Sequence, residues 1–332
     1  MKLSVIIICW NDSRYILDCI RSVYNGTSGL DFEIIVTDNG STDGSVDMIR
    51  EAFPQVRIIQ NGANIGFGPA NNAGVRAAAG DYVLILNPDT IVHPDALKRM
   101  IDFAIGHPEG GAFGCRVLNT DGSLQWTAQP EPTLLRYIII ALSMRWLGRL
   151  SPRFQADGYP GWDGRTEKTI GFQAGCALLV PRTLFESIGG FDPRFSHQFE
   201  DADLCLRLRQ SGRPTLFCPD AEITHIGGYN RGSYSLSVVL ETERSKCRFF
   251  HKHYGARGVR QIRAVSMLGI ALRLAGYGVL RLIRPQSGVR ERIANYRLLL
   301  KWYRELNPSR FIENGEEPDV IRRSLCPAPQ AG

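Results

Sequence analysis

Polar side chains follow the first two apolar segments of the chain, at the predicted strand ends. Asn11 comes after the run LSVIIICW, and Asp38 ends the run FEIIVTD and begins the turn DNGSTDGS. A carboxylate directly after a strand can accept hydrogen bonds from a ribose or a nucleobase, and the N-terminus of the next helix beside it attracts phosphate. The alternative is a turn with a helix cap, in which Ser41 or Thr42 caps the next helix and Asp43 complements its dipole.

The sequence LNPDT and a late histidine offer ligands for a divalent cation. Asp89 supplies a carboxylate, and Asn87 supplies an amide oxygen or binds the ion through water. Mg²⁺ typically takes one or two carboxylates together with substrate phosphates. His225, in AEITHIGG, ends an alternating apolar segment, and its neutral imidazole can complete such a site. The alternatives are a Pro-Asp turn at a strand end and a histidine hydrogen-bonded within the fold.

Three carboxylates stand close together at the predicted start of a helix. Glu200, Asp201 and Asp203 lie in the sequence FEDADLCLR. The helix dipole favours the ionised form of carboxylates in a first turn, and an ionised carboxylate can accept the proton of an attacking hydroxyl. The alternative is that one of the three caps the helix and the other two are solvated.

The elements that must position these residues alternate between strand and helix. Short apolar runs predict strands at 3–10, 32–38, 56–61 and 81–87. Apolar residues at helical spacing predict helices at 13–25, 46–53 and 68–79. This alternation favours an α/β fold with a parallel sheet. Ligands of such sheets bind beyond the carboxyl ends of the strands, which is where the polar residues stand.

The following part of the chain is less regular. Residues 171–182 have strand character, and residues 199–212 predict a helix. An apolar stretch at 133–150 is broken by Arg136 and Arg145.

The composition is that of a soluble globular protein with one large domain or two. Of the 332 residues, 44% are hydrophobic and 22% are charged, which excludes a disordered, collagen-like or disulfide-stapled chain. The net charge is +6, but the segment 241–310 holds 16 Lys and Arg against 4 Glu, a local balance of +12, so the rest of the chain carries −6.

This basic segment predicts contact with an anionic surface. Its apolar run 264–283 is interrupted by Arg273 and Arg281, which favours a helix lying in a membrane interface over one that spans the bilayer. The alternative is a helical appendage that packs on the rest of the chain or on a second subunit in a homodimer. The residues after 312 are expected to form a loose tail.

The cysteines and the N-terminus indicate a reducing compartment. The eight cysteines are scattered without a Cys-x-x-Cys pair, and several lie in apolar runs, as buried free thiols do. We therefore expect no structural zinc. The first apolar run is too short for a signal peptide, and no run of about 18 uninterrupted apolar residues occurs.

Taken in order, these motifs resemble glycosyltransferase family 2. The order is Asn-Asp after the first strand, DNGSTDGS after the second, N-x-G-x-G from Asn64 with Asn72 beyond it, LNPDT, GG-FD-x-x-F, FEDADLCLR and a late histidine. The combination is similar to the rhamnosyltransferase-type branch of the family and covers about residues 3–230.

The resemblance implies a GT-A fold, which is an α/β fold with a mainly parallel central sheet flanked by helices. A catalytic domain is expected at 1–240, with a nucleotide-binding half at 1–90 and an acceptor-binding half at 91–240. A basic amphipathic helical extension at 241–312 and a flexible tail at 313–332 are expected to follow.

The resemblance also implies roles for individual residues. The residues implied to contact the nucleotide are Asn11, Asp38, Asn64, Gly66 and Asn87. Asp89 takes the last position of the family's Asp-x-Asp metal motif, where Asn87 replaces the first Asp, and His225 matches a late histidine that can bind the metal. Asp201 corresponds to the catalytic base, with Glu200 as its neighbour.

The implied activity is that of an inverting glycosyltransferase that uses Mg²⁺ or Mn²⁺. The donor is a dTDP- or UDP-sugar, with rhamnose as a candidate sugar, and the acceptor is a glycan or a polyprenyl-linked glycan in cell-surface polysaccharide synthesis. The protein is expected in the cytoplasm, peripherally at the inner face of the plasma membrane, with no nucleic-acid partner.

Three other functions share parts of this pattern. A dinucleotide-dependent oxidoreductase needs Gly-x-Gly-x-x-Gly after the first strand, and here that turn is CWNDSRY. A nucleotidyltransferase usually has a basic phosphate loop near its N-terminus, which this sequence lacks. A non-catalytic nucleotide-sugar-binding protein or membrane scaffold is the remaining alternative, although Asp89 and Asp201 are the carboxylates that an active transferase needs.

Overall fold

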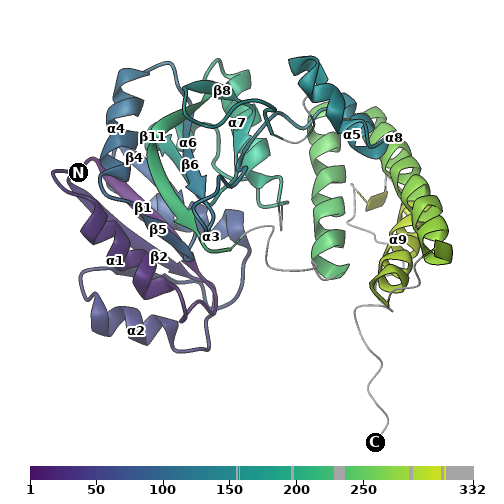
Figure 1. Cartoon of the computed structure of the whole chain (residues 1–332). Helices are drawn as coiled ribbons and strands as arrows, with labels where there is room; N and C mark the ends of the chain where they lie inside the picture. Colours follow the sequence, from purple (N-terminus) through teal and green to yellow (C-terminus); the bar gives the residue numbers. More distant parts are fainter. Residues whose placement is uncertain are drawn as a thin grey trace, which may run out of the picture. The chain divides into compact units, whose positions relative to one another are not determined.

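The computed structural model describes residues 1–154, 156, 158–195, 198–227, 236–283, 287–307 and 310–311. Contacts within the chain divide it into two compact units (Figure 1). The sheet unit comprises Met1–Glu131 and Asp157–Gly232, and the helical unit comprises Pro132–Ala156 and Ser233–Gly332. The stretch 132–156 therefore belongs with the C-terminal helices by its contacts.

The sheet unit is built around one mixed sheet. Its strand order is β3-β2-β1-β4-β10-β6-β11-β5, and β8 pairs with β11. The strands are β1 (Leu3–Cys9), β2 (Phe32–Asp38), β3 (Arg57–Gln60), β4 (Tyr82–Leu86), β5 (Thr90–Val92), β6 (Ala112–Leu118), β8 (Lys168–Ile170), β10 (Ala177–Pro181) and β11 (Thr215–His225). The short strands β7 (Ala128–Gln129) and β9 (Phe172–Gln173) pair separately.

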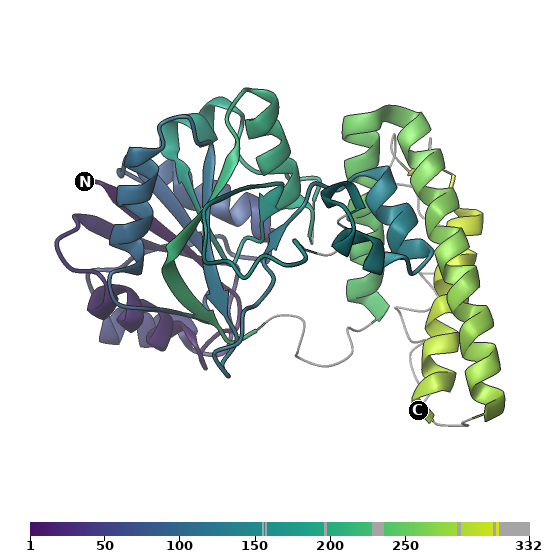
Figure 2. The same ribbon diagram turned by 45° about the horizontal axis from the view of Figure 1, so that its top comes forward.

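Helices cover both faces of this sheet, as Figures 1 and 2 show. One face carries α1 (Ile16–Gly26), α2 (Ser45–Ala52) and α4 (Ala96–Gly106). The other carries α3 (Phe67–Ala77), α6 (Arg182–Ser187) and α7 (Glu200–Gln210). Successive side chains of a strand point to opposite faces, so Val5 and Ile7 of β1 join the first core and Ile6 joins the second.

The strand directions bring several strand ends to one edge of the sheet. β1 to β4 are parallel to one another, which confirms the predicted alternation of strands and helices. Beyond β4 the sheet is mixed, because β10 runs antiparallel to both β4 and β6, and β11 runs parallel to β6. The first residues of β10 therefore lie where β4 ends, and the N–H of Asn87 donates to the carbonyl oxygen of Cys176 over 3.1 Å.

The predicted strand character of residues 171–182 is confirmed, and a turn divides the segment into β9 and β10. The structure excludes both helix-capping alternatives. The N-cap of α2 is Gly44, so neither Ser41 nor Thr42 caps that helix. The N-cap of α7 is Phe199, so none of the three carboxylates of FEDADLCLR caps it.

The helical unit confirms the predicted helical extension and has its own core. Its elements are α5 (Leu134–Ala141), the 3₁₀ helices η1 (Arg145–Arg149) and η2 (Pro152–Phe154), α8 (Leu236–Ile283) and α9 (Ser287–Glu305). α8 is broken at Gly255, whose φ of 64° lies in the left-handed region. Trp302 and Tyr303 of α9 are fully buried against Leu240 and Cys247 of α8.

Two arginines of this unit bind backbone oxygens. Arg273 donates to the carbonyl oxygens of Gly269 at 3.0 Å and of Ile140 at 3.1 Å, and so joins α8 to α5. Arg136 is buried and donates to the carbonyl oxygen of Ala156. The guanidinium of Arg273 therefore satisfies carbonyl groups within the unit.

One helix among the described residues, over Val238–Leu280, is long and apolar enough to cross a membrane by length and composition. Only 17% of its most apolar window is buried. The predicted tail at 313–332 and the side chain of Arg281 lie outside what the structure describes.

Candidate active site

Asp38 and Asn11 join the loops that follow β1 and β2. The carboxylate of Asp38 is buried and accepts hydrogen bonds from the N–H groups of Gly40 at 3.2 Å and Ser41 at 3.1 Å. Oδ1 of Asn11 accepts from the N–H of Thr42 at 2.8 Å, and the N–H of Asn11 donates to Oγ of Ser41 at 3.0 Å. Both predicted nucleotide residues therefore stand at the carboxyl ends of parallel strands, within one hydrogen-bonded turn.

An amide network links this turn to the loop before α3. Nδ2 of the buried Asn39 donates to Oδ1 of Asn64 and to the carbonyl oxygen of Gly66, both at 3.4 Å. Oδ1 of Asn39 accepts from Nδ2 of Asn61 at 2.9 Å, and Oδ1 of Asn64 accepts from the N–H of Gly66 at 3.0 Å. Asn39 thus connects Asn64 and Gly66 to the strand that ends at Asp38.

Asp89 and His225 meet where β4 and β11 end. Oδ1 of Asp89 lies 3.1 Å from Nε2 of His225, and each residue is 9% exposed. Nδ2 of Asn87 lies 3.3 Å from the same Nε2. The register of β5 on β11, which pairs Thr90 with His225, produces this meeting. A Cβ at Gly227 would fall 2.3 Å from Oδ2 of Asp89, so a larger residue at this position would displace the carboxylate.

This cluster fits a divalent cation that is shared with a phosphate ligand. It offers one carboxylate, one imidazole and a nearby amide, and no third His, Cys, Asp or Glu joins them in the described part of the chain. Mg²⁺ usually keeps several waters and is bound by one or two carboxylates and substrate phosphates. The cluster therefore offers the one or two protein ligands that such an ion requires.

Glu200 and Asp201 begin α7 beside the loop that precedes β10. Phe199, with a left-handed φ of 70°, turns the chain into the helix. Oδ2 of Asp201 accepts from the N–H of Gly175 at 3.1 Å, and Oδ1 accepts from the N–H of Ala202 at 2.7 Å. Oε2 of Glu200 is buried and has no hydrogen-bond partner among the described residues.

Burial makes this pair less acidic than the helix dipole alone predicts. Loss of water, together with the neighbouring charge of Asp201, raises the pKa of Glu200 to about 8. Burial raises the pKa of Asp201 to about 6, against the lowering effect of the N–H groups of Ala202 and Gly175. Burial therefore favours the neutral form of Glu200 more than that of Asp201, and it opposes the ionised cluster that the helix dipole favours.

The loop before β10 connects the two sets of carboxylates. The carbonyl oxygen of Cys176 accepts from the N–H of Asn87, and the N–H of Gly175 donates to Asp201. The pKa of the Cys176 thiol is raised to about 12, first by burial and then by the charges of Asp89 and Asp201. Both carboxylates are therefore close to the same thiol, and the predicted metal residues and base residues share one site.

Three residues of this region are absent from the predicted set. Asn39 has one sequence signal, its place directly after β2. Nδ2 of Asn72 donates to the carbonyl oxygen of Phe191 at 2.8 Å, and Oδ1 of Asn72 accepts from the N–H of Phe191 at 2.9 Å. Gln125 lies 2.7 Å from His225, a partner 100 residues away, and nothing in its local sequence indicates that contact.

Comparison with known proteins gives a family and several relatives. The model of the family described as Glycosyl transferase family 2 matches residues 4–189. An N-acetylglucosaminyl-diphospho-decaprenol L-rhamnosyltransferase from Mycobacterium tuberculosis is 30% identical over 277 residues, which are 75% of this chain and 88% of the relative.

Solved structures share the fold. A mannosyltransferase from Pyrobaculum calidifontis, in complex with GDP-Man and Mn²⁺, matches with a TM-score of 0.54 and 16% identity over 91% of this chain and 87% of that one. GalNAc-T7 with UDP, GalNAc and Mn²⁺ matches with a TM-score of 0.54 and 14% identity over 80% of this chain and 55% of that one. The expected GT-A fold is confirmed.

We expect Glu200→Gln to stabilise the protein at about pH 9 and to do so less at about pH 5. A carboxyl whose pKa is raised by folding contributes stability that is full below its unfolded pKa and is lost as pH rises through the folded value, about 8 here. Because glutamine carries no charge at any pH, the substitution should raise the free energy of unfolding at high pH by on the order of a few kcal/mol. Urea unfolding at both pH values measures the gain, with the exposed Glu186→Gln as control. A gain that is independent of pH would contradict the prediction.

Proposed function

This chain belongs to glycosyl transferase family 2, and on that premise we propose that it transfers a sugar from a nucleoside-diphosphate donor to a lipid-linked glycan, with inversion at the anomeric carbon. The observation that carries the proposal is the loop before β10, which contacts the end of β4 and Asp201. An inverting transfer needs two groups in reach of one substrate pair, a stabiliser for the departing diphosphate and a base for the acceptor hydroxyl.

The ends of β1, β2 and β4 suit the donor. Asp38 and Asn11 stand where α/β sheets bind nucleotides. Each carboxylate oxygen of Asp38 has a second acceptor position for a ribose or a base. Mg²⁺ or Mn²⁺ bound at Asp89 and His225 would supply positive charge that stabilises the departing diphosphate.

Asp201 suits the base of a single displacement. Its pKa of about 6 leaves it ionised at neutral pH and still basic enough to accept a proton. The acceptor oxygen attacks the anomeric carbon, the bond to the diphosphate breaks, and the hydroxyl proton goes to Asp201. Because Glu200 stays protonated up to about pH 8, the negative charge is confined to Asp201. One displacement inverts the anomeric configuration.

The mycobacterial relative indicates the classes of substrate. Its name describes an L-rhamnosyltransferase that acts on N-acetylglucosaminyl-diphospho-decaprenol. For this chain we propose a dTDP- or UDP-sugar donor, with rhamnose as the first sugar to test, and a polyprenyl-linked glycan acceptor in cell-surface polysaccharide synthesis. A polyprenyl-linked acceptor is held in a membrane, so we propose that the transferase works at a membrane surface, on its cytoplasmic face.

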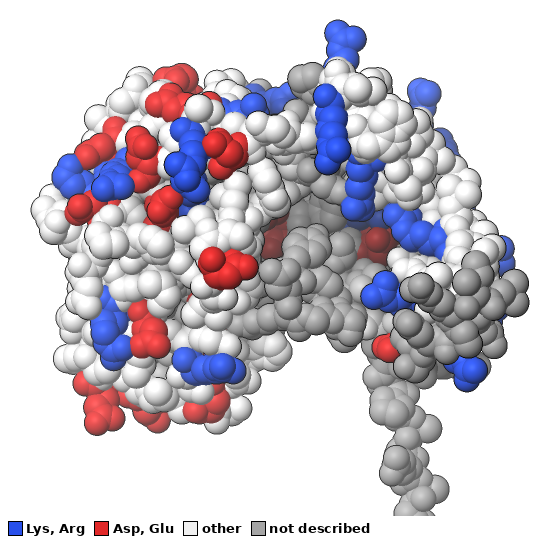
Figure 3. Space-filling view, viewed as in Figure 1, with Lys and Arg blue, Asp and Glu red and all other residues white. Residues whose placement is uncertain are grey.

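The helical unit has a surface suited to peripheral membrane contact. Trp146, Leu150 and Leu268 are 59%, 72% and 49% exposed, and the exposed Arg145 and Arg149 flank Trp146 and Leu150 in sequence. Figure 3 shows mainly Lys and Arg on the visible face of this unit, whereas the sheet unit displays both signs of charge. Each cation near an anionic leaflet contributes about 1 kcal/mol, and Trp and Leu add apolar burial in the interface.

We expect Asp89→Ala to abolish turnover while the fold is retained, because the cation loses its one protein carboxylate. The assay follows sugar transfer from dTDP- and UDP-sugars to a polyprenyl-linked glycan with Mn²⁺. The exposed Asp102→Ala is the control. Full activity of Asp89→Ala in the presence of a chelator would overturn the metal role. No transfer by the wild type from any donor would favour the non-catalytic alternative.

We expect Asp201→Asn to lower kcat by roughly two to four orders of magnitude, because an amide cannot accept the proton. Donor binding should survive, since Asp201 contacts backbone groups at the acceptor side. In the wild type, kcat should fall as pH falls through about 6, where Asp201 takes up a proton. Near wild-type kcat in Asp201→Asn would exclude this residue as the base and leave Glu200 as the next candidate.

We expect the double change Trp146→Ser with Leu150→Ser to reduce binding to anionic vesicles several-fold, because both side chains are exposed apolar groups beside arginines. Co-sedimentation of the full chain at low salt measures the bound fraction. Ile105→Ser, at a 53% exposed position of the sheet unit, is the matched control. A wild-type protein that stays in the supernatant would refute membrane contact and favour packing of this surface in a homodimer.

A further inference from the structure

The side chain of Gln125 makes contacts with three other residues. Its Oε1 lies 2.7 Å from Nδ1 of His225. Its Nε2 donates to Oδ1 of Asn119 at 2.9 Å and to the carbonyl oxygen of Gly227 at 3.1 Å. Gln125 therefore links the chain after β6 to the end of β11, and the proposed reaction does not use it directly.

These contacts determine which nitrogen of His225 carries a hydrogen. A backbone carbonyl oxygen only accepts hydrogen bonds, so the amide atom of Gln125 that faces Gly227 must be the NH₂ group. The amide atom that faces Nδ1 of His225 is then the oxygen, which also only accepts. Nδ1 must therefore carry the hydrogen. Nε2 is the ring nitrogen that remains for a metal ion, and it lies 3.1 Å from Oδ1 of Asp89.

We propose that Gln125 is a positioning residue for metal binding, which holds His225 in the Nδ1–H tautomer with Nε2 directed at Asp89. The inference rests on the metal role proposed above for Asp89 and His225. Histidines that bind metals generally donate their other ring N–H to a protein acceptor, which orients the ring and raises its basicity. Loss of such an acceptor typically lowers metal affinity about 10- to 100-fold.

The turn before Gln125 is ordered by its own hydrogen bonds. Oδ1 of Asp121 accepts from the N–H of Ser123 at 2.9 Å and from its hydroxyl at 2.5 Å. Nδ2 of Asn119 donates to Oγ of Ser123 at 2.9 Å, which leaves Oδ1 of Asn119 facing Gln125. The N–H of Gln125 donates to the carbonyl oxygen of Val117 at 2.8 Å. Gln125 is thus held on both its backbone and its side chain before any metal binds.

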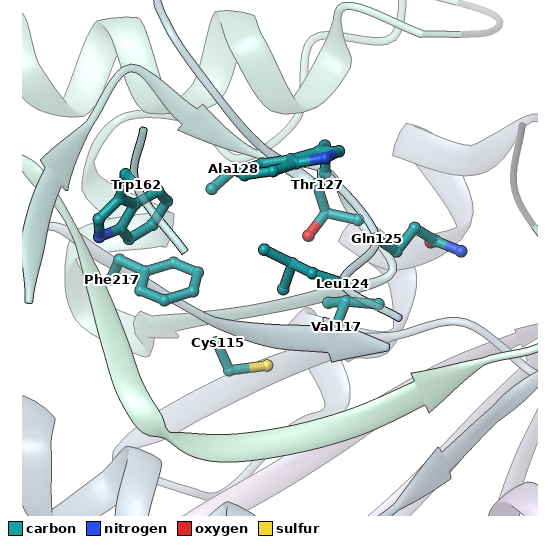
Figure 4. A pocket seen from close by; sticks show the side chains of 9 residues that line it. Cys115, Val117, Leu124, Gln125, Thr127, Ala128, Trp162 and Phe217 are labelled. Atoms are coloured by element: carbon teal, nitrogen blue, oxygen red, sulfur yellow. The ribbon is translucent and has the colours of Figure 1, made fainter. Parts of the chain in front are cut away.

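Apolar packing holds the other side of the same segment. A small pocket is lined mainly by apolar side chains, among them Leu124, Val117, Trp162 and Phe217. Figure 4 shows the side chain of Gln125 directed away from Trp162 and Phe217. Gln125 also lines this pocket, and its amide group extends from there to His225.

Binding of Mn²⁺ to the full chain in the presence of UDP, followed by electron paramagnetic resonance, tests the proposal. Gln125→Met keeps the length of the side chain and removes its acceptor, and it should weaken Mn²⁺ binding about 10- to 100-fold. The coupling between bound Mn²⁺ and the ring nitrogen of His225, measured in pulsed spectra, should weaken in the same variant. Gln129→Met is the matched control, because Gln129 binds the backbone of Trp126 and Gly158 instead. Asn119→Ala removes one partner of Gln125 and should weaken Mn²⁺ binding less than Gln125→Met does. If Gln125→Met does not fold, Asn119→Ala takes its place in the test.

The outcomes separate this inference from the proposed function. If the wild type binds Mn²⁺ and Gln125→Met binds it with the same affinity, only the role of Gln125 is overturned. A wild type that binds no Mn²⁺ in the presence of UDP overturns the proposed metal site and this inference together. Nitrogen NMR of the histidine side chains, with His225 assigned by its loss in His225→Ala, should show hydrogen on Nδ1 in the wild type and a changed tautomer in Gln125→Met.

Discussion

The site depends on the direction of one strand. Because β10 runs antiparallel to β4, the backbone that enters β10 lies against the end of β4. Cys176 of this backbone receives the N–H of Asn87, and the preceding Gly175 donates its N–H to Asp201. A parallel β10 would begin at the opposite edge, and α7 would then have no backbone group through which to meet the ends of β1, β2 and β4.

The same arrangement places carboxylates where water is scarce, and this costs stability. Buried carboxyl groups must find hydrogen bonds or cations, or else remain protonated. Asp201 is compensated by two backbone N–H groups, whereas Oε2 of Glu200 has no partner among the described residues. Burial therefore raises the pKa of Glu200, and keeping this carboxyl buried beside Asp201 costs stability.

The helical unit shows why net charge is an incomplete guide to a surface. Some of its cations, such as Arg273 and Arg136, bind carbonyl oxygens inside the unit and stabilise the packing of its elements. The cations that remain on the surface include Arg145 and Arg149, near the exposed Trp146. A count of basic residues identifies a region rich in charge, and only packing separates the structural cations from those able to meet an anionic surface.

Local patterns in the sequence determine the alternation of strands and helices from β1 to β4, and they locate Asp89 and Asp201 at the ends of elements, because strand ends and first helical turns are local features. Only the tertiary structure decides which of these residues meet. Gln125 and His225 are 100 residues apart, and a hydrogen bond over that separation follows from strand order and register, which no local pattern records. The charge of Glu200 is decided in the same way, because the helix dipole is a local property that favours ionisation, whereas the burial that opposes it arises only when α7 packs in the folded sheet unit.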